Sequence, residues 1–159
     1  MEDIDTLGWE ANTIGELDHR EVKAPYIRLS SVTKGQKGDK VYVFDLRVTQ
    51  PNTSYLSTIQ LHSIEHLLLA GFRNYLPQNF VCVAPMGCQT GFYLILQNEA
   101  NAKKIIQVYE NILKDILELK QVPYANVKDC GQAQHHDLTQ AQYVASRLLT
   151  NKSSWQNVL

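Results

Sequence analysis

The sequence of residues 57–75 is STIQLHSIEHLLLAGFRNY, and this stretch predicts the central helix of the fold. Either Ser57 or Thr58 can cap the start of that helix, because their hydroxyl oxygens accept hydrogen bonds from backbone N–H groups. Leucine and phenylalanine side chains cover much of the helix surface, so we expect the helix to be well buried. His62 and His66 are four residues apart and therefore share one face of it.

His62 and His66, with Glu65 between them, form an HxxEH string. Two imidazoles on one face can bind the same metal ion, and Glu65 would then lie near that ion as a group able to move protons. A catalytic metal site usually has three protein ligands, so a third must come from elsewhere in the chain. Cys130, in a polar loop, is the leading candidate. Two rival ligands remain open, His135 and His136.

Two imidazoles and one thiolate are ligands that suit zinc or ferrous iron. Two other interpretations of the string stay open at this point. HxxEH also occurs in inverzincin peptidases, in which Glu65 would activate a metal-bound water. Alternatively, the histidines are polar residues of an amphipathic helix and never bind metal. Buried imidazoles and carboxylates need partners, so the leucine-rich surroundings favour a metal.

The segment MGCQTG, residues 86–91, predicts a turn that presents a thiol. Its two glycines allow the backbone to turn sharply and to approach a ligand closely. Cys88 is therefore expected to be more exposed than a cysteine in a strand. Near a cation the pKa of this thiol would fall and it could serve as an acid or base, whereas without a cation it is an ordinary turn cysteine.

An alternating segment, residues 40–48, predicts a strand with Phe44 on its core face. Asp45 and Arg47 fall on the opposite face, which borders either solvent or a pocket. The polar residues 33–40 predict a hairpin loop that leads into this strand. The other expected elements are strands at 26–29, 80–84 and 91–96 and helices at 101–119 and about 137–149. The segment 80–84 is short and apolar, which is consistent with a buried strand. Together they predict an α+β protein, in which an antiparallel sheet packs against helices.

Composition limits the possible partners and the location of the protein. A length of 159 residues matches one compact domain, residues 1–159. The 15 basic and 16 acidic residues give a net charge of −1, which argues against nucleic acid as the main partner. No apolar run approaches the roughly 20 residues of a membrane span. The acidic N-terminus is unlike a signal peptide, and three cysteines do not suggest a disulfide framework, so we expect a cytoplasmic protein.

Several short segments, taken in order, make the sequence similar to the S-ribosylhomocysteine lyase (LuxS) family, from about residue 17 to residue 149. Each segment is weak alone, whereas their joint order and spacing are highly specific. They are LDH at 17–19, VKAPYIR at 22–28, FDLR at 44–47, QPN at 50–52, HSIEHLL at 62–68, PMGCQTGFY at 85–93, CGQA at 130–133 and HDL at 136–138. This resemblance implies a LuxS-like fold and outweighs the peptidase interpretation.

The resemblance also implies roles for individual residues. The implied metal ligands are His62, His66 and Cys130, the implied acid/base groups are Glu65 and Cys88, and the implied substrate contacts are His19 and Arg47. The implied metal is ferrous iron (Fe2+), which zinc or cobalt can replace. The sequence departs from the family pattern at Ile14, where a serine is common, and at Cys82, where an acidic residue is common.

The implied reaction is a step of the methionine cycle that also serves autoinducer synthesis in quorum sensing. S-ribosylhomocysteine is cleaved to homocysteine and 4,5-dihydroxy-2,3-pentanedione, the precursor of autoinducer-2, by carbonyl migration and β-elimination. The resemblance further implies a homodimer with active sites at the subunit interface, where the N-terminal region of one chain completes the other's pocket. A non-catalytic relative that binds a small thioether or a partner protein is the remaining alternative.

Overall fold

The predicted central helix is α2, Thr58–Tyr75, in the computed structural model, which describes residues 4–159. Of the two possible caps, Ser57 is the one used. Its side chain accepts a hydrogen bond from the Gln60 N–H, and the Gln60 side chain accepts one from the Ser57 N–H. This reciprocal pair fixes where the helix begins. Residues 1–3 of the expected domain lie outside the described residues, so its boundaries stay a prediction.

The strands form one antiparallel sheet in the order β1-β2-β4-β3. Their bounds are Tyr26–Lys34 (β1), Lys40–Arg47 (β2), Phe80–Pro85 (β3) and Gly91–Gln97 (β4). The other helices are α1 (Ile4–Leu7), α3 (Ala102–Glu118) and α4 (Leu138–Thr150), with short 3-10 turns η1 (Ala11–Thr13) and η2 (Lys152–Ser154). The expected α+β class with an antiparallel sheet is confirmed. None of the helices in residues 4–159 is both long and apolar enough to cross a membrane.

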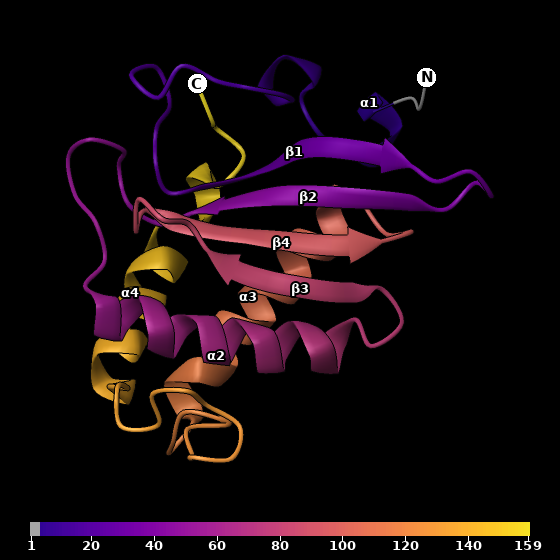
Figure 1. The fold of residues 1–159 in the computed structure, drawn as a ribbon. Coiled ribbons are helices and arrows are strands. Elements are labelled where there is room, and N and C mark those ends of the chain that lie inside the picture. Colours follow the sequence, from indigo (N-terminus) through magenta and orange to yellow (C-terminus); the bar gives the residue numbers. More distant parts are fainter. Residues whose placement is uncertain (1–3) are drawn as a thin grey trace.

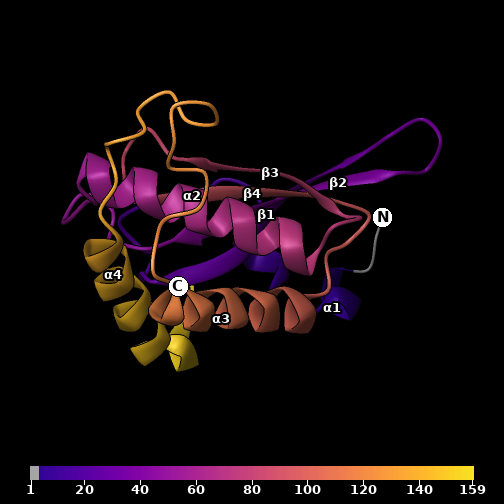
Figure 2. The same cartoon turned by 90° about the horizontal axis from the view of Figure 1, so that it is seen from below.

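Helices α2 and α3 lie on the same face of the sheet, and α4 packs against α3 (Figures 1 and 2). The side chains of Phe44 and Leu94 point from β2 and β4 into this helical layer and are fully buried. At Gly71 of α2, an added Cβ would lie 2.6 Å from side-chain atoms of Ile112 in α3. The missing side chain therefore lets the two helices approach each other closely.

The opposite face of the sheet carries no helix in the part of the chain that the structure describes (Figure 1). We call it the outer face, and its side chains on β2 and β4 are those of Val41, Val43, Asp45, Arg47, Tyr93, Ile95 and Gln97. Tyr93 is 43% exposed and Val41 is 36% exposed. Four residues of the N-terminal segment line a cavity of about 460 Å³ together with part of this face: Gly15, Glu16, Leu17 and His19.

Two sequence-based expectations need correction. The segment 80–84 was expected to be a buried strand, but β3 is an edge strand in which Val81 is 53% exposed. A short apolar run does not reveal how many neighbours its strand has. The segment 33–40 was expected to be loop, but polar residues up to Lys34 continue the pairing of β1 with β2 and leave only a short turn. Register with β2 overrides the polarity of the end of β1.

Candidate metal centre and thiol pocket

Four possible metal-binding side chains converge between α2 and the loop that joins α3 to α4. His62 and His66 project from one face of α2, as the sequence spacing predicts, and Cys130 and His136 come from the loop. The ligand atoms of these residues all lie within 4.8 Å of one another. Of the two rival histidines, the structure brings His136 into the cluster, whereas the ring of His135 lies behind His62, with 3.2 Å between their Nδ1 atoms.

Two backbone carbonyl groups orient the imidazoles of α2. Nδ1 of His62 lies 2.9 Å from the carbonyl oxygen of His135, and Nδ1 of His66 lies 2.8 Å from that of Pro123. A carbonyl oxygen can only accept, so each Nδ1 carries the proton and each Nε2 keeps a free lone pair. Metal-binding histidines in proteins are typically held in this way by a second hydrogen bond.

The distances around Cys130 also fit metal coordination. Its Sγ lies 3.4 Å from Nε2 of His62 and 3.5 Å from Nε2 of His136. Sulfur and nitrogen ligands of a tetrahedral zinc ion are about 3.6 Å apart, given the usual bond lengths. The backbone N–H of Gln132 donates a hydrogen bond to the same sulfur over 3.4 Å. The residues present therefore fit a divalent metal ion.

His136 differs from the two α2 imidazoles in its surroundings. Burial, together with the nearby rings of His62, His66 and His135, lowers the pKa of His136 to about 4, so its ring is neutral at physiological pH. Its Nδ1 is buried and has no hydrogen-bond partner among the described residues. Sequence reasoning named His136 only as a rival to Cys130, because it cannot show that a loop brings both to one point.

Glu65 lies beside the cluster. One of its carboxylate oxygens is 3.9 Å from Nε2 of His66. Glu65 and His66 both line a cavity of about 310 Å³, together with side chains that include Arg73, Tyr124 and Asp129. A carboxylate in this position can exchange protons with a molecule bound in the cavity.

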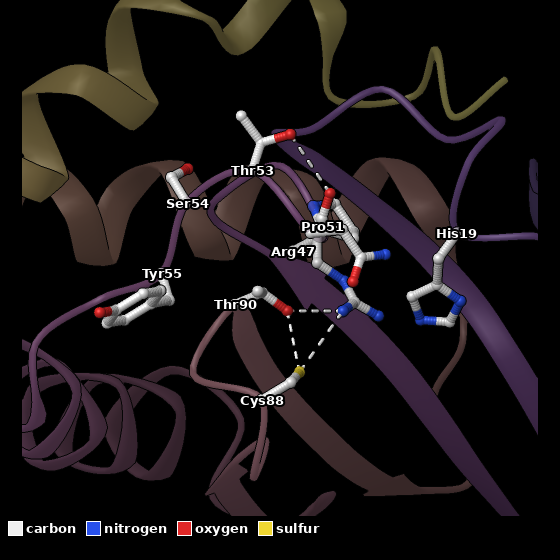
Figure 3. A pocket seen from close by; sticks show the side chains of 9 residues that line it. His19, Arg47, Pro51, Thr53, Ser54, Tyr55, Cys88 and Thr90 are labelled. Carbon is white, nitrogen blue, oxygen red and sulfur yellow. Dashed lines mark hydrogen bonds between the residues drawn. The ribbon is translucent and has the colours of Figure 1, made fainter.

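A second cavity, of about 370 Å³, contains the exposed thiol of Cys88 and is also lined by Arg47, Thr90 and His19 (Figure 3). Nη1 of Arg47 donates a hydrogen bond to Oγ1 of Thr90 over 2.7 Å, and the same oxygen lies 3.0 Å from Sγ of Cys88. Because the guanidinium can only donate, the hydroxyl hydrogen of Thr90 is free to point at the sulfur.

The surroundings of Cys88 favour its thiolate form. Burial raises the pKa of the Cys88 thiol, but the hydrogen bonds from Thr90 and the charge of Arg47 outweigh it, so the net effect is a lowered pKa. Arg47, with Nη1 3.9 Å from the sulfur, is the cation that the sequence analysis required for this effect. Thr90 belongs to the segment 86–91, but the sequence does not show that its hydroxyl group lies close to the sulfur of Cys88.

The sequence analysis attributed the sharp bend at Cys88 to the two flanking glycines, but the structure shows another arrangement. The residue with a left-handed backbone is Gln89, with φ of 60°. Gly91 serves close packing instead, because an added Cβ would lie 3.0 Å from Cα of Arg47 and would press on the carbonyl oxygen of Leu46. The small residue therefore keeps β4 close to β2, and with it Cys88 close to Arg47.

Arg47 is held by a buried carboxylate. Asp45, 1% exposed, accepts hydrogen bonds from Nη2 of Arg47 over 2.7 Å and from its Nε over 3.1 Å. The same carboxylate accepts from Nε of Arg28 over 3.3 Å and from the Tyr26 hydroxyl over 3.1 Å. Burial, with the charge of Asp45, raises the pKa of Tyr26 to about 12, so this hydroxyl stays protonated. Asp45 and Arg47 thus border a pocket, one of the two settings that the strand pattern allowed.

Arg28 connects this network to the N-terminal segment. Its Nη1 donates to the carbonyl oxygens of Thr13 and Gly15 over 2.6 and 2.7 Å. These bonds fix the backbone shortly before His19, whose exposed ring lies at the cavity of Cys88. Ile14, between the two carbonyls, packs against the main hydrophobic core, so an apolar side chain suits this position.

The predicted site residues fall into two groups in one chain. The metal group comprises His62, Glu65, His66 and Cys130, and the thiol group comprises His19, Arg47 and Cys88. Within residues 4–159, the cavity at Glu65 and the cavity at Cys88 share no lining residue. The structure thus brings each group together but does not bring the two groups together. The roles of the individual residues stay predictions.

An α+β fold with a His/Cys cluster between its central helix and the loop from α3 to α4 defines a class of protein with a metal-binding site. Comparison with known sequences narrows this class. Residues 15–159 match the family model described as S-ribosylhomocysteinase (LuxS). The chain is 48% identical over 142 residues to the S-ribosylhomocysteine lyase of Halobacillus halophilus, which covers 89% of this chain and 93% of that protein.

Two further relatives agree. The S-ribosylhomocysteine lyase of Oceanobacillus iheyensis is 44% identical over 142 residues, with 89% of this chain and 92% of that protein covered. The S-ribosylhomocysteine lyase of Helicobacter pylori strain J99 is 43% identical over 143 residues, with 89% and 93% covered. The chain belongs to the S-ribosylhomocysteinase (LuxS) family, as the sequence resemblance predicted.

Proposed function

We propose that the protein is an S-ribosylhomocysteine lyase, which cleaves the thioether of S-ribosylhomocysteine to homocysteine and 4,5-dihydroxy-2,3-pentanedione. Membership of the family carries this proposal. Its chemistry is supported by a metal-binding cluster beside the carboxylate of Glu65 and by the thiol of Cys88, whose pKa is lowered beside Arg47. The product is the precursor of autoinducer-2, which makes the reaction a step in autoinducer synthesis as well as in the recycling of homocysteine.

The reaction requires two groups that move protons. In the open-chain sugar, a proton leaves the carbon next to the carbonyl group and another returns to the former carbonyl carbon, so that the carbonyl moves along the chain. Once the carbonyl lies β to the thioether carbon, loss of one more proton expels homocysteine, and the electron pair of the C–S bond leaves with sulfur. Glu65 and Cys88 are the proposed acid/base pair, because each lines a cavity and because carboxylates and thiols are groups that can accept and donate protons.

His62, His66 and Cys130 are the proposed ligands of the metal. A divalent ion held there supplies Lewis acidity to the oxygens of the sugar when it is bound. We propose ferrous iron as the working metal, with zinc or cobalt able to replace it, because imidazole and thiolate ligands accept all three. His19 and Arg47 are proposed to contact the substrate. The two cysteine roles need reduced thiols, which supports the cytoplasm as the compartment.

We also propose a homodimer in which the thiol group of one chain faces the metal group of the other. The separation of the two groups within one chain supports this arrangement, because a single substrate must meet both Glu65 and Cys88. The outer face offers a surface for the partner: within residues 4–159 no helix covers it, and it exposes Val41 and Tyr93. Exposed apolar side chains beside polar ones are typical of interfaces between chains.

Release of free thiol from S-ribosylhomocysteine tests the proposed function. Protein purified without oxygen and loaded with Fe2+ should release thiol continuously, and removal of the metal by a chelator should stop it. Casein is the matched control substrate, because a peptidase that used Glu65 would cleave it. Casein cleavage without thiol release would favour the peptidase interpretation. If the metal-loaded protein binds S-ribosylhomocysteine but releases no thiol, the protein is a non-catalytic relative.

A further inference from the structure

We propose that Gln50 is a positioning residue, whose side-chain amide holds the segment of His19 against the cavity of Cys88 and thereby supports substrate binding. The hold itself rests on contacts within the chain. Its effect on substrate binding rests in addition on the proposed function, in which His19 contacts the substrate. The sequence resemblance includes Gln50 in a matching segment but gives it no role, and the inference comes from its contacts in the structure.

The segment that carries His19 depends on contacts with the rest of the chain to keep its place. Residues 14–25, between η1 and β1, form neither helix nor strand. On the side before His19, Arg28 binds two carbonyl oxygens of the chain, and the N–H of Gly15 donates to the carbonyl oxygen of Ser30 over 2.9 Å. This half of the segment is therefore fixed to β1.

On the side after His19, the side chain of Gln50 binds the backbone twice. Its Nε2 donates to the carbonyl oxygen of Val22 over 2.8 Å, and its Oε1 accepts from the N–H of Ala24 over 2.9 Å. A primary amide can donate and accept at once, so it pairs with the two backbone groups as a neighbouring strand would. Val22 is 3% exposed, and a buried carbonyl group that loses its partner costs free energy.

Within residues 4–159, this half of the segment has few other ties to the rest of the chain. The N–H of Lys23 donates to the carbonyl oxygen of Val158 over 2.8 Å. Val22 packs in a small cluster with Tyr26 and Val158, which is separate from the main hydrophobic core. The amide of Gln50 therefore supplies two of the three hydrogen bonds described for residues 22–24.

Gln50 can hold the segment because it is itself fixed beside the thiol pocket. The residues that follow it, 51–55, line the same cavity as Cys88 (Figure 3). At the end of this loop, Leu56 exchanges two hydrogen bonds with Gln89, the neighbour of Cys88, and each is 2.9 Å long. One side chain thus connects the segment of the substrate-contacting histidine to a loop that is tied to the reactive thiol.

Loss of the amide should affect substrate binding more than proton transfer. Without it, His19 has no single place at the cavity, and the substrate must order the segment when it binds, which lowers affinity. Gln50 makes no printed contact with Glu65 or Cys88, the groups proposed to move protons. KM should therefore rise while kcat changes far less.

Amide hydrogen exchange, followed by NMR in zinc-loaded protein, tests the hold. Gln50→Met keeps the length of the side chain without its amide. The N–H of Lys23 is the reporter, because it binds Val158 and not Gln50, and in the variant it should exchange about tenfold faster or more. The N–H of Gly15, on the side held by Arg28, should keep its wild-type rate. An unchanged rate at Lys23 would overturn the hold.

Two further variants complete this experiment. Gln107→Met is the matched control: it makes the same change at an exposed position of α3 and should leave the exchange of Lys23 unchanged. If Gln50→Met does not fold, Gln50→Glu takes its place. A carboxylate there can still accept from Ala24 but cannot donate to Val22, so Lys23 should again exchange faster.

Thiol release from S-ribosylhomocysteine by Fe2+-loaded protein tests the effect on the substrate. In Gln50→Met, KM should rise about tenfold, with the wild-type pH profile of kcat retained. A purely structural defect would lower the amount of active protein, and with it kcat, at an unchanged KM, and that result would overturn the effect on substrate binding. If the wild-type protein releases no thiol, the proposed function and this effect both fail, and the exchange rate of Lys23 still decides whether Gln50 holds the segment.

Discussion

The thiol of Cys88 shows how single neighbours set the charge of a reactive group. Thr90 accepts a hydrogen bond from Arg47, and its own hydroxyl group can donate a hydrogen bond to the sulfur of Cys88. The charge of the guanidinium thus acts on the thiolate both directly and through Thr90. Asp45, in turn, keeps the guanidinium in place from behind.

Thr90→Val tests this chain of contacts. Valine has the shape of threonine but no hydroxyl group, so the thiolate loses a hydrogen bond and the pKa of Cys88 should rise. Alkylation of Cys88 by iodoacetamide, followed against pH in zinc-loaded protein that also carries Cys82→Ser, should become severalfold slower at neutral pH. Thr53→Val, at the wall of the same cavity, is the control and should leave the rate unchanged. An unchanged pH profile in Thr90→Val would mean that Arg47 acts alone.

Asp45 provides a second prediction at this scale. Its carboxylate is buried between two arginines that are themselves buried, so Asp45→Asn leaves two guanidinium charges without a counter-charge. Loss of one partner from such a cluster costs about 3–5 kcal/mol of the free energy of unfolding, which urea denaturation measures. Asp18→Asn breaks an exposed pair with Arg20, so it should lower the free energy of unfolding far less than Asp45→Asn does. Equal losses in the two variants would contradict a structural role for the buried cluster.

Residue identity alone predicted part of this chemistry. His62, Glu65 and His66 are neighbours on one helix, so their spacing in the sequence already fixes their spacing in space. The contributions of Thr90 and Asp45 depend on the pairing of β2 with β4 and with β1. Residues far apart in the chain meet there, and no local pattern records that meeting.

At the scale of elements, α2 and α3 are held together at a position where a side chain is missing. Gly71 lies in the interior of α2, where glycine normally weakens a helix. The close approach of Ile112, which is 1% exposed, explains why alanine does not fit there.

Gly71→Ala should therefore destabilise the protein, by about 1–3 kcal/mol, although alanine is the better helix former. The double variant with Ile112→Ala should lose less stability than the sum of the two single losses, because the new methyl group enters space that isoleucine left. Urea denaturation of the three variants measures both effects. If Gly71→Ala stabilises the protein, then α2 and α3 are farther apart at Gly71 and Ile112 than the structure indicates.

Helix boundaries were easier to predict than strand positions. Ser57 and Asp137 have the capping chemistry that begins α2 and α4, and both caps act locally, within three residues. Whether a strand lies at the edge of a sheet depends on partners elsewhere in the chain, which is why β3 was misjudged. The loop from Leu119 to Asp137 has no periodic pattern at all, so the approach of His136 to the metal group could not be predicted from the sequence.

At the scale of the whole molecule, the proposed dimer assigns each active site to two chains. Sequence reasoning reached this arrangement only through the family resemblance, since no pattern within one chain states which surface meets another chain. The structure adds a physical reason, because one chain keeps Glu65 and Cys88 in separate cavities.

Subunit complementation tests the shared site. Glu65→Gln and Cys88→Ala proteins, each inactive alone, are mixed, unfolded and refolded together. Random pairing should restore about a quarter of wild-type thiol release, because half of the dimers are then mixed and each mixed dimer has one intact site. His19→Ala with Cys88→Ala is the control pair, since both residues line one cavity and no mixed dimer has an intact site. No recovery in the first pair, with mixed dimers present, would place each site within one chain.

The carbonyl groups of Pro123 and His135 that orient the metal ligands belong to the loop between α3 and α4, which has no helix or strand of its own. Long loops of this kind stay ordered only where specific contacts tie them down, and otherwise they open to proteases. Cys130 would anchor this loop by binding the metal, and a chain without metal lacks that anchor. Proteases should therefore cleave the metal-free chain first in this loop. The supply of metal in a cell would then decide how long each copy of the protein survives, in addition to whether it works.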